Sequence, residues 1–122
     1  MGRVGQSGPM IRGEVYDARL DPVEGSEQGG TRPVVVVSRD AIHNNSMVAL
    51  IVPFTTFRPH RKLYPSHVLV HAPEGGLHVD SVALAEQSRV LSRTRLLQFR
   101  GALSAATMAR IGRAISIAFD LD

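Results

Sequence analysis

The chain has 122 residues, carries 14 Lys and Arg against 11 Asp and Glu for a net charge of +3, and contains no cysteine. This length predicts one domain with a single modest core. The lack of cysteine excludes a disulfide framework, a thiol nucleophile and a thiolate metal site, and it is compatible with a reducing cytoplasm, where we expect the protein to act. The positive charge suits a polyanionic partner.

The N-terminal segment lacks the apolar centre of a signal peptide, because residues 1–9 hold three glycines and one valine. We expect residues 1–9 to be a disordered leader or a remnant of cloning, with Met10 as the natural start, and residues 10–122 to form the single domain. The longest apolar stretch, residues 47–54, is much shorter than the roughly 20 residues of a membrane span. The sequence therefore predicts no membrane partner.

Short strands are predicted in the first half of this domain. Residues 13–20 mix apolar and polar side chains and end at Asp-Pro, which is typical of a strand closed by a turn. Residues 34–37 and 47–52 are continuous, β-branched apolar runs, the pattern of strands buried on both faces, and we expect them at the centre of a barrel. Between them, residues 39–46 could form one helical turn, with Asp40 as a possible N-cap.

The pattern changes along the second half. Residues 67–72 alternate, with Val68 and Val70 on one face, and this predicts a half-exposed strand. Residues 82–87 and 89–91 predict two more short strands.

A helix is predicted after Ser104, which is a suitable N-cap. Its apolar residues recur at steps of three and four, the spacing of one helix face. These residues are Met108, Ile111, Ala114, Ile115, Ala118 and Phe119. The fold class is therefore mainly β, a small, strongly curved, largely antiparallel barrel with one terminal helix laid across it.

Residues 25–33, with the sequence GSEQGGTRP, place a carboxylate, an amide, a hydroxyl and a guanidinium in one loop before a strand. Its glycines permit positive φ and a close approach of a ligand to the backbone, so that N–H groups can turn toward an anion. Arg32 is expected where the loop becomes strand, held by the fixed φ of Pro33.

With residues 12–16 and 20–22, this loop resembles the MazF/PemK family of toxin endoribonucleases, also called Kid. The resemblance continues through residues 52–56 (VPFTT), 65–68 (PSHV) and 80–87 (DSVALAEQ), and so runs from about Met10 to the C-terminus. It implies an SH3-like barrel and a two-fold homodimer.

The resemblance also implies a function: a sequence-specific, metal-independent endoribonuclease, the toxin of a type II toxin–antitoxin system, that cuts single-stranded mRNA and arrests growth. The products would carry a 2′,3′-cyclic or 3′-phosphate and a 5′-OH. The implied partner besides RNA is an acidic, MazE-like antitoxin whose flexible segment covers the basic groove. No cofactor is expected.

In this reaction the RNA 2′-OH attacks the adjacent phosphate, so the enzyme must accept a proton, stabilise the phosphorane oxygens and supply a proton to the leaving 5′ oxygen. The resemblance assigns catalysis to Arg32 and Thr55. Arg32 would neutralise the non-bridging oxygens and could assist proton transfer, while Thr55 would donate a hydrogen bond to the same phosphate. Because an arginine is a poor base, Glu27 is our candidate proton acceptor. The alternative is that Glu27 only anchors the loop.

Residues 57–62 add an aromatic ring and several cations after the third strand, a combination that binds single-stranded RNA through stacking and phosphate charge. The alternative is a solvated hairpin tip. The resemblance implies that Glu86 and Gln87 read base edges as acceptor and donor; the alternative is that they are polar residues on the exposed face of a strand. The predicted RNA-binding residues are Ser26, Gln28, Thr56, Phe57, Arg58, Arg61, Lys62, Glu86 and Gln87. Arg89, Arg93, Arg95 and Arg100 could extend this track; the alternative is that they are solvated or lie at the rim of a dimer.

The Kid branch uses a histidine in the first loop and an arginine and an aspartate in a later strand, where this chain has Ser26, Leu84 and Glu86. The mechanism should therefore follow the MazF branch. The five histidines lack the compact spacing of metal ligands, so we expect no metal site.

Two other classes of function remain open. One is a non-enzymatic toxin of the same barrel, like CcdB, but that relative depends on a tryptophan near its C-terminus, and this chain has none. The other is an SH3-like binding module whose site no longer works, against which the presence of Arg32, Thr55 and Glu27 together argues.

Overall fold

A computed structural model of the protein describes residues 8–121. Residues 1–7, which make up most of the predicted leader, and Asp122 lie outside the described residues. Within the described part, no helix is long and apolar enough to cross a membrane.

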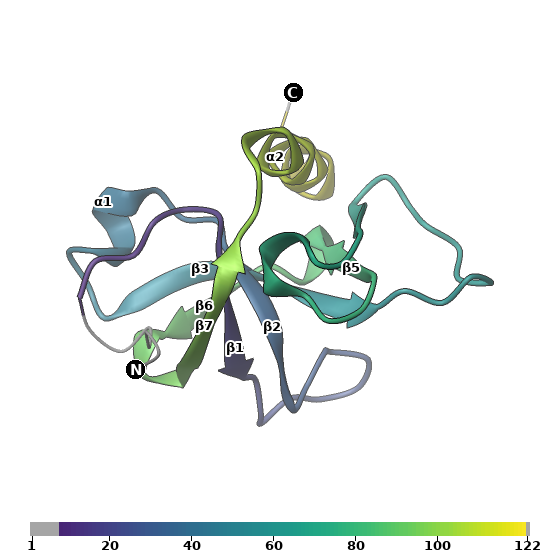
Figure 1. Cartoon of the computed structure of the whole chain (residues 1–122). Coiled ribbons are helices and arrows are strands. Elements are labelled where there is room, and N and C mark those ends of the chain that lie inside the picture. The colour runs from purple at the N-terminus through teal and green to yellow at the C-terminus, as the bar shows by residue number, and fades with distance from the viewer. Residues whose placement is uncertain (1–7, 122) are drawn as a thin grey trace.

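Seven strands form one curved antiparallel sheet, which confirms the mainly β prediction. The order is β4-β5-β3-β2-β1-β7, and β6 pairs with the first half of β3. β3 therefore pairs with three other strands and crosses the molecule (Figure 1). The strands are β1 (Glu14–Arg19), β2 (Thr31–Val36), β3 (Val48–Thr56), β4 (His67–Val70), β5 (Ser81–Leu84), β6 (Arg89–Ser92) and β7 (Leu96–Ala102).

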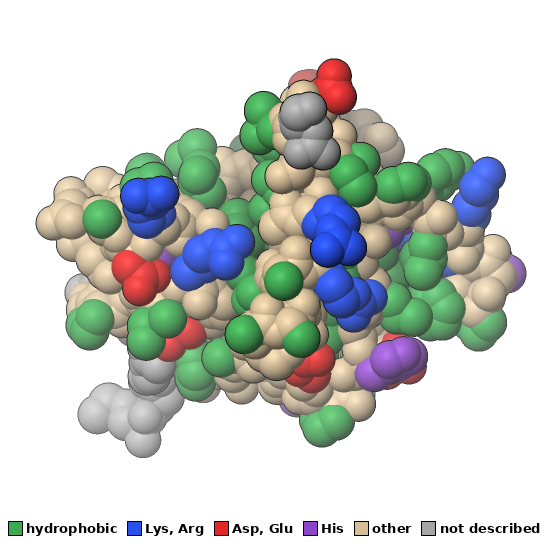
Figure 2. Space-filling view, turned by 90° about the horizontal axis from the view of Figure 1, so that it is seen from above, with side chains coloured by type: hydrophobic (Ala, Val, Ile, Leu, Met, Phe, Trp, Pro, Cys, Tyr) green, Lys and Arg blue, Asp and Glu red, His purple; other side chains and the backbone are tan. Residues whose placement is uncertain are grey.

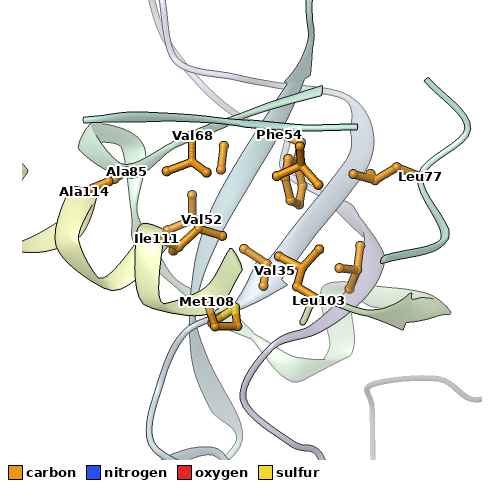
Figure 3. Packing of buried hydrophobic residues seen from close by; sticks show 13 residues of the cluster. Val35, Val52, Phe54, Val68, Leu77, Ala85, Leu103, Met108, Ile111 and Ala114 are labelled. Atoms are coloured by element: carbon orange, nitrogen blue, oxygen red, sulfur yellow. The ribbon is translucent and has the colours of Figure 1, made fainter. Parts of the chain in front are cut away.

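The central strands are buried on both faces, as the continuous apolar runs predicted. Neighbouring residues of β2 enter different clusters: Val35 packs under the C-terminal helix, while Val34 and Val36 pack on the opposite side of the sheet. Figure 3 shows the first cluster, with Val52 and Phe54 of β3 beside Val35. The site described below therefore stands on the strands that pack on both faces of the sheet.

The short helical elements are α1 (Asp40–His43) and the 3₁₀ turns η1 (Glu74–Gly76), η2 (Ala85–Gln87) and η3 (Arg93–Arg95). The predicted turn at 39–46 is confirmed, but Asp40 is not its N-cap. Arg39 holds that position without a side-chain bond. Asp40 Oδ1 instead accepts the backbone N–H of Arg12 at 2.8 Å, so this carboxylate ties the N-terminal segment to α1.

The C-terminal helix is α2 (Ala105–Phe119), and the hydroxyl of Ser104 accepts the N–H of Thr107 at 3.1 Å as the predicted cap. Met108 and Ile111 are buried against the sheet, as predicted. The end of the predicted stripe is wrong, because Ala118 is exposed and Phe119 is 59% exposed. The last turn of α2 borders an apolar hollow of about 410 Å³ instead of packing on side chains.

Two further differences from the prediction concern the second half. Residues 85–87 form η2 and not a strand end, because Ala85 N–H bonds Ser66 O and Ser88 N–H bonds Ala85 O, which takes the chain out of the ladder. β7 was not predicted at all. Its pairing with β1 contains two register shifts, so that its side chains do not follow a simple alternation.

Candidate active site

The register of β2 and β3 brings Arg32 and Thr55 together. Val34 pairs with Pro53 and Val35 with Val52, and continuing this antiparallel register two residues further sets Arg32 opposite Thr55. Both residues line one cavity of about 300 Å³, which we call the arginine cavity. The two residues that the family resemblance assigned to catalysis therefore share one hollow, although 22 residues separate them in the chain.

Arg32 is held at two points. Its Nε donates to the carbonyl of Gly29 at 2.8 Å and its Nη1 to the carbonyl of Phe54 at 3.2 Å. One bond ties the guanidinium to the glycine-rich loop and the other to β3. Since a guanidinium has five N–H donors, these bonds fix its orientation and leave donors for an anion in the cavity. Arg32 lies within β2 and not before it, because the strand begins at Thr31.

Thr55 and Thr56 follow Phe54, whose ring is buried in the core. Alternation along the strand turns Thr55, which is half-buried, toward the arginine cavity. In the described part of the chain, neither threonine hydroxyl hydrogen-bonds another residue. The common structural use of such residues, to satisfy neighbouring backbone groups, is therefore not the one seen here.

Glu27 lies elsewhere. It lines a second cavity of about 210 Å³, the glutamine cavity, with Gln28, Glu86 and Gln87. Its Oε1 accepts the backbone N–H of Glu24 at 2.7 Å, which closes a turn inside the loop. The structure thus groups Glu27 with the predicted base-reading residues and not with Arg32 and Thr55.

Gln87 joins the glycine-rich loop to η2. Its Oε1 accepts the N–H of Gln28 at 2.8 Å, and its Nε2 donates to the carbonyl of Ser26 at 3.5 Å. Nearby, a Cβ on Gly29 would lie 2.8 Å from Asp21 Oδ1 and 2.7 Å from the Val23 side chain, so any larger residue there would force these two side chains to shift. The loop that presents Arg32 is therefore fixed by packing as well as by hydrogen bonds.

Glu86 is also engaged. Its two carboxylate oxygens accept from Ser66 Oγ at 3.0 Å and meet His67 Nε2 at 3.1 Å. The Nδ1 of His67 accepts the N–H of Tyr64 at 3.2 Å, which assigns the proton to Nε2. Glu86 thereby anchors the end of the loop at 57–66, at the rim of the glutamine cavity.

The loop at 57–66 extends away from the body of the molecule (Figure 1). Phe57 is half-buried and its N–H bonds Asp80 O at 2.9 Å, whereas Arg58 and Lys62 are exposed. Lys62 Nζ lies 5.2 Å from the centre of the Tyr64 ring, a cation–π distance. Arg61 Nε is shielded from solvent and has no hydrogen-bond partner among residues 8–121.

His78, Ser81 and Arg100 are also among the residues that line the arginine cavity. Sequence reasoning did not place His78 or Ser81 in the site, although they flank Asp80 at the start of the family motif. Arg100 was considered only as part of an RNA track, because its strand was not predicted. It forms an ion pair with Asp17, Nη1 to Oδ1 at 2.9 Å.

The other arginines proposed for an RNA track are mostly structural. Arg93 is buried and donates to the carbonyls of His43 and Gly8, and Arg95 donates to the carbonyls of Arg19 and Asp21. On the face that carries α2, Lys and Arg side chains form small groups that other residues separate (Figure 2). This face therefore shows no continuous basic track.

Within residues 8–121, no three His, Asp or Glu side chains come close enough to hold a metal ion. His67, at the start of β4, contacts Glu86, and His71, just after β4, contacts Asp80.

The carboxylate of Asp80 is stabilised in its charged form. The backbone N–H of Ala72 and then the side chain of His71 hold the pKa of Asp80 below its ordinary value, because both stabilise the charged carboxylate.

Comparisons with known proteins find relatives that all belong to one family of toxins. Residues 11–119 match the family of PemK-like, MazF-like toxins of type II toxin–antitoxin systems. The chain is 40% identical over 117 residues to the endoribonuclease MazF9 of Mycobacterium tuberculosis, covering 92% of this chain and 98% of that protein.

Two solved structures share the fold over most of both chains. MazF from Deinococcus radiodurans superposes with a TM-score of 0.79 at 26% identity, covering 94% of this chain and all of the other (100%). A mycobacterial endoribonuclease in complex with its cognate antitoxin superposes with a TM-score of 0.77 at 25% identity, covering 93% and 97%.

Proposed function

The chain belongs to the PemK-like, MazF-like family of type II toxin–antitoxin toxins, and from this premise we propose that it is a sequence-specific endoribonuclease that cuts single-stranded mRNA without a metal ion. The observation that carries the proposal is the arginine cavity, where a doubly held guanidinium lies opposite a threonine with a free hydroxyl. Both groups donate hydrogen bonds, which is what a phosphorane requires.

In the proposed reaction, the phosphate at the scissile bond lies in the arginine cavity. The 2′ oxygen loses its proton and bonds to phosphorus, and the bond between phosphorus and the 5′ oxygen breaks. Arg32 and Thr55 stabilise the non-bridging oxygens as negative charge gathers on them. The products are a 2′,3′-cyclic phosphate, which water can open to a 3′-phosphate, and a 5′-OH.

The role of Glu27 that these contacts favour is to anchor the loop that carries Arg32, because its carboxylate closes a turn with Glu24 at the glutamine cavity. The alternative role, acceptor of the 2′-OH proton, requires the loop to rearrange when RNA binds. Glu27→Gln distinguishes them, because the amide oxygen can still accept the Glu24 N–H but cannot take a proton. An anchor tolerates this change, and a base does not.

Bases flanking the scissile phosphate would lie at the glutamine cavity and along the loop at 57–66. Ser26, Gln28, Glu86 and Gln87 would offer polar groups at the first, while Phe57, Arg58, Arg61 and Lys62 would hold the strand at the second. Thr56 is exposed and lines the arginine cavity, one residue before the start of this loop.

We propose a homodimer in the cytoplasm whose partner is an acidic antitoxin. The supporting observation is the related mycobacterial endoribonuclease, which was solved with its cognate antitoxin. A carboxylate of such an antitoxin placed in the arginine cavity would occupy the donors that bind phosphate, and so would block cleavage.

The test is incubation of the purified protein, in EDTA, with a long single-stranded RNA, followed by mapping of the cut sites and their end groups. Arg32→Ala is compared with Arg113→Ala, since Arg113 is an exposed arginine on α2. Recurrent cuts in one short sequence with 5′-OH ends, lost only in Arg32→Ala, support the proposal. Uncut RNA from folded, antitoxin-free protein contradicts it and favours a toxin that acts by binding.

A further inference from the structure

The arginine cavity has many proton donors and few acceptors. Guanidinium and hydroxyl groups of Arg32, Thr55, Thr56, Ser81 and Arg100 line it, and no carboxylate of residues 8–121 does. Guanidinium ions cannot act as bases at neutral pH, and hydroxyls accept a proton only weakly. Yet the proposed cleavage begins with the transfer of the 2′-OH proton to an acceptor. The groups considered so far therefore leave the 2′-OH proton without an acceptor.

His78 is the residue of this lining that can supply it. Histidine changes its protonation state between pH 5 and 8, and a neutral imidazole has a free lone pair. The side chain is exposed to the cavity mouth, and no hydrogen bond or ion pair joins it to another residue of the described range 8–121. Its ring nitrogens are thus available to a substrate.

The backbone around His78 is fixed on both sides. On one side, Leu77 is buried and points into the main core cluster (Figure 3). The carbonyl of Gly76 accepts two bonds from the Arg100 guanidinium, at 3.1 and 2.8 Å. A Cβ on Gly76 would lie only 2.1 Å from the backbone oxygen of Arg100, so the segment lies directly on β7.

On the other side, Asp80 fixes the segment. Its carbonyl accepts the N–H of Phe57 at 2.9 Å, and its Oδ1 accepts the N–H of Ala72 at 2.9 Å. The backbone that carries the imidazole is therefore fixed at both ends, so the ring can move only about its own side-chain bonds at the cavity mouth.

We propose that His78 is a catalytic base of the ribonuclease and takes the 2′-OH proton; this inference rests on the function proposed above. The imidazole lone pair accepts the proton as the 2′ oxygen bonds to phosphorus. The bond to the 5′ oxygen breaks, that oxygen takes a proton from water, and the imidazolium returns its proton to water. Arg32 and Thr55 keep their roles at the non-bridging oxygens.

The charged groups around His78 come from three strands. Arg32 of β2 and Arg100 of β7 line the same cavity, and Asp17 of β1 lines a neighbouring hollow that His78 also borders. Arg100 and Asp17 neutralise each other in their ion pair. Asp80, on the same segment as His78, meets His71 instead. A neutral imidazole is the active form, so cleavage should slow as the pH falls and the ring takes up a proton.

The experiment compares His78→Gln with His71→Gln, an exposed histidine that contacts Asp80 outside the cavity. We expect His78→Gln to lower kcat about 100-fold or more, with KM unchanged. The decrease of the cleavage rate at low pH should also disappear in this variant. His71→Gln should keep the rate and the pH profile. Binding of an RNA with a 2′-deoxy group at the cut site should be the same in all three proteins.

Chemical rescue tests the role directly. Added imidazole should restore cleavage by His78→Ala and should leave Arg32→Ala inactive. A His78→Gln protein with the wild-type rate and pH profile would overturn the proposal, as would a His78→Ala protein that has weakened RNA binding and gains nothing from imidazole. If the wild-type protein cuts no RNA, the proposed ribonuclease fails first; if it cuts and needs Arg32 but not His78, only this inference fails.

Discussion

The two loops that border the candidate site differ in how they are held. The glycine-rich loop between β1 and β2 is fixed by bonds from Arg32, Gln87 and Asp21, the last of which accepts the N–H of Gly30 at 3.0 Å. The loop at 57–66 is attached at its ends, and one turn bond, Arg61 N–H to Arg58 O at 2.8 Å, supports its middle. The proposed cleavage would need the fixed geometry of the first loop, whereas the less constrained second loop would suit the binding of an RNA strand with varied bases.

Arg32→Lys, on the fixed loop, is the variant expected to have the largest effect. Lysine keeps the charge but cannot hold both the Gly29 and Phe54 carbonyls and still present donors to a phosphate. We expect kcat to fall about 100- to 1,000-fold. Single-turnover cleavage of a short RNA measures it, and a rate within a few-fold of wild type would show that charge alone suffices.

Thr55→Val removes one hydroxyl at nearly constant shape. A hydrogen bond to a charged group contributes about 1.5–3 kcal/mol, so the cleavage rate should fall about 10- to 100-fold. Thr55→Ser, which keeps the hydroxyl, should recover most of it. Equal rates for the Val and Ser variants would mean that this hydroxyl does not contact the reacting phosphate.

Gly29→Ala tests the fixed loop without touching a reacting group. The added methyl would meet Asp21 and Val23 at less than 3 Å, and such overpacking costs about 1–3 kcal/mol. The free energy of unfolding from urea denaturation should fall by that amount. Gly112→Ala on α2 is the control, because its Cβ would meet only one atom, at 3.8 Å, and its stability should hold or rise.

Changes in the loop at 57–66 should be milder. Arg58→Ala combined with Lys62→Ala removes two exposed cations, so KM should rise several-fold while kcat stays the same. The slope of log affinity against log salt should fall by about 0.7 for each RNA phosphate that these side chains neutralise in the wild-type protein. An unchanged slope would mean that they do not reach the RNA backbone.

The smallest effect concerns Asp80, whose carbonyl accepts the N–H of Phe57 at the start of the loop at 57–66. Its pKa is lowered in the folded protein by the Ala72 N–H and by His71. Its contribution is therefore present above the unfolded pKa of about 3.9 and is lost as the pH falls through the lower folded value. The urea midpoint of Asp80→Asn should fall less steeply below pH 4 than that of wild type. Asp120→Asn, at the end of α2, should follow wild type.

Much of the fold could be predicted because its signals are local. The β-branched runs gave β2 and β3, and the three- and four-residue spacing after Ser104 gave α2. β7 was missed because its register shifts against β1 hide the alternation of Leu96–Ala102. The exposure of Phe119 could not be predicted either, since periodicity says which face a residue occupies but not where the sheet beneath it ends.

For the site, the family resemblance predicted Arg32 and Thr55, and the antiparallel register of β2 and β3 explains why they lie opposite each other. It did not indicate that Glu27 lies at the other cavity or that Glu86 and Gln87 hold loops in place. Those facts depend on contacts such as Gln28 with Gln87, which join residues 59 positions apart. His78 was one of five histidines without a distinguishing pattern, and only the cavity lining separates it from the others.

The pairing of Arg32 with Thr55 through the ladder also governs which insertions and deletions the chain can accept. The connection at 37–47 does not set the separation of the two residues, but it is itself packed, because His43 of α1 is buried and its ring meets Ser38 Oγ at 2.8 Å and the Met10 carbonyl at 2.9 Å. One residue added or removed within either strand would turn Thr55 to the opposite face of the sheet. A change of length inside β2 or β3 should therefore disrupt the site itself, whereas a change in the connection should first disturb the packing of α1.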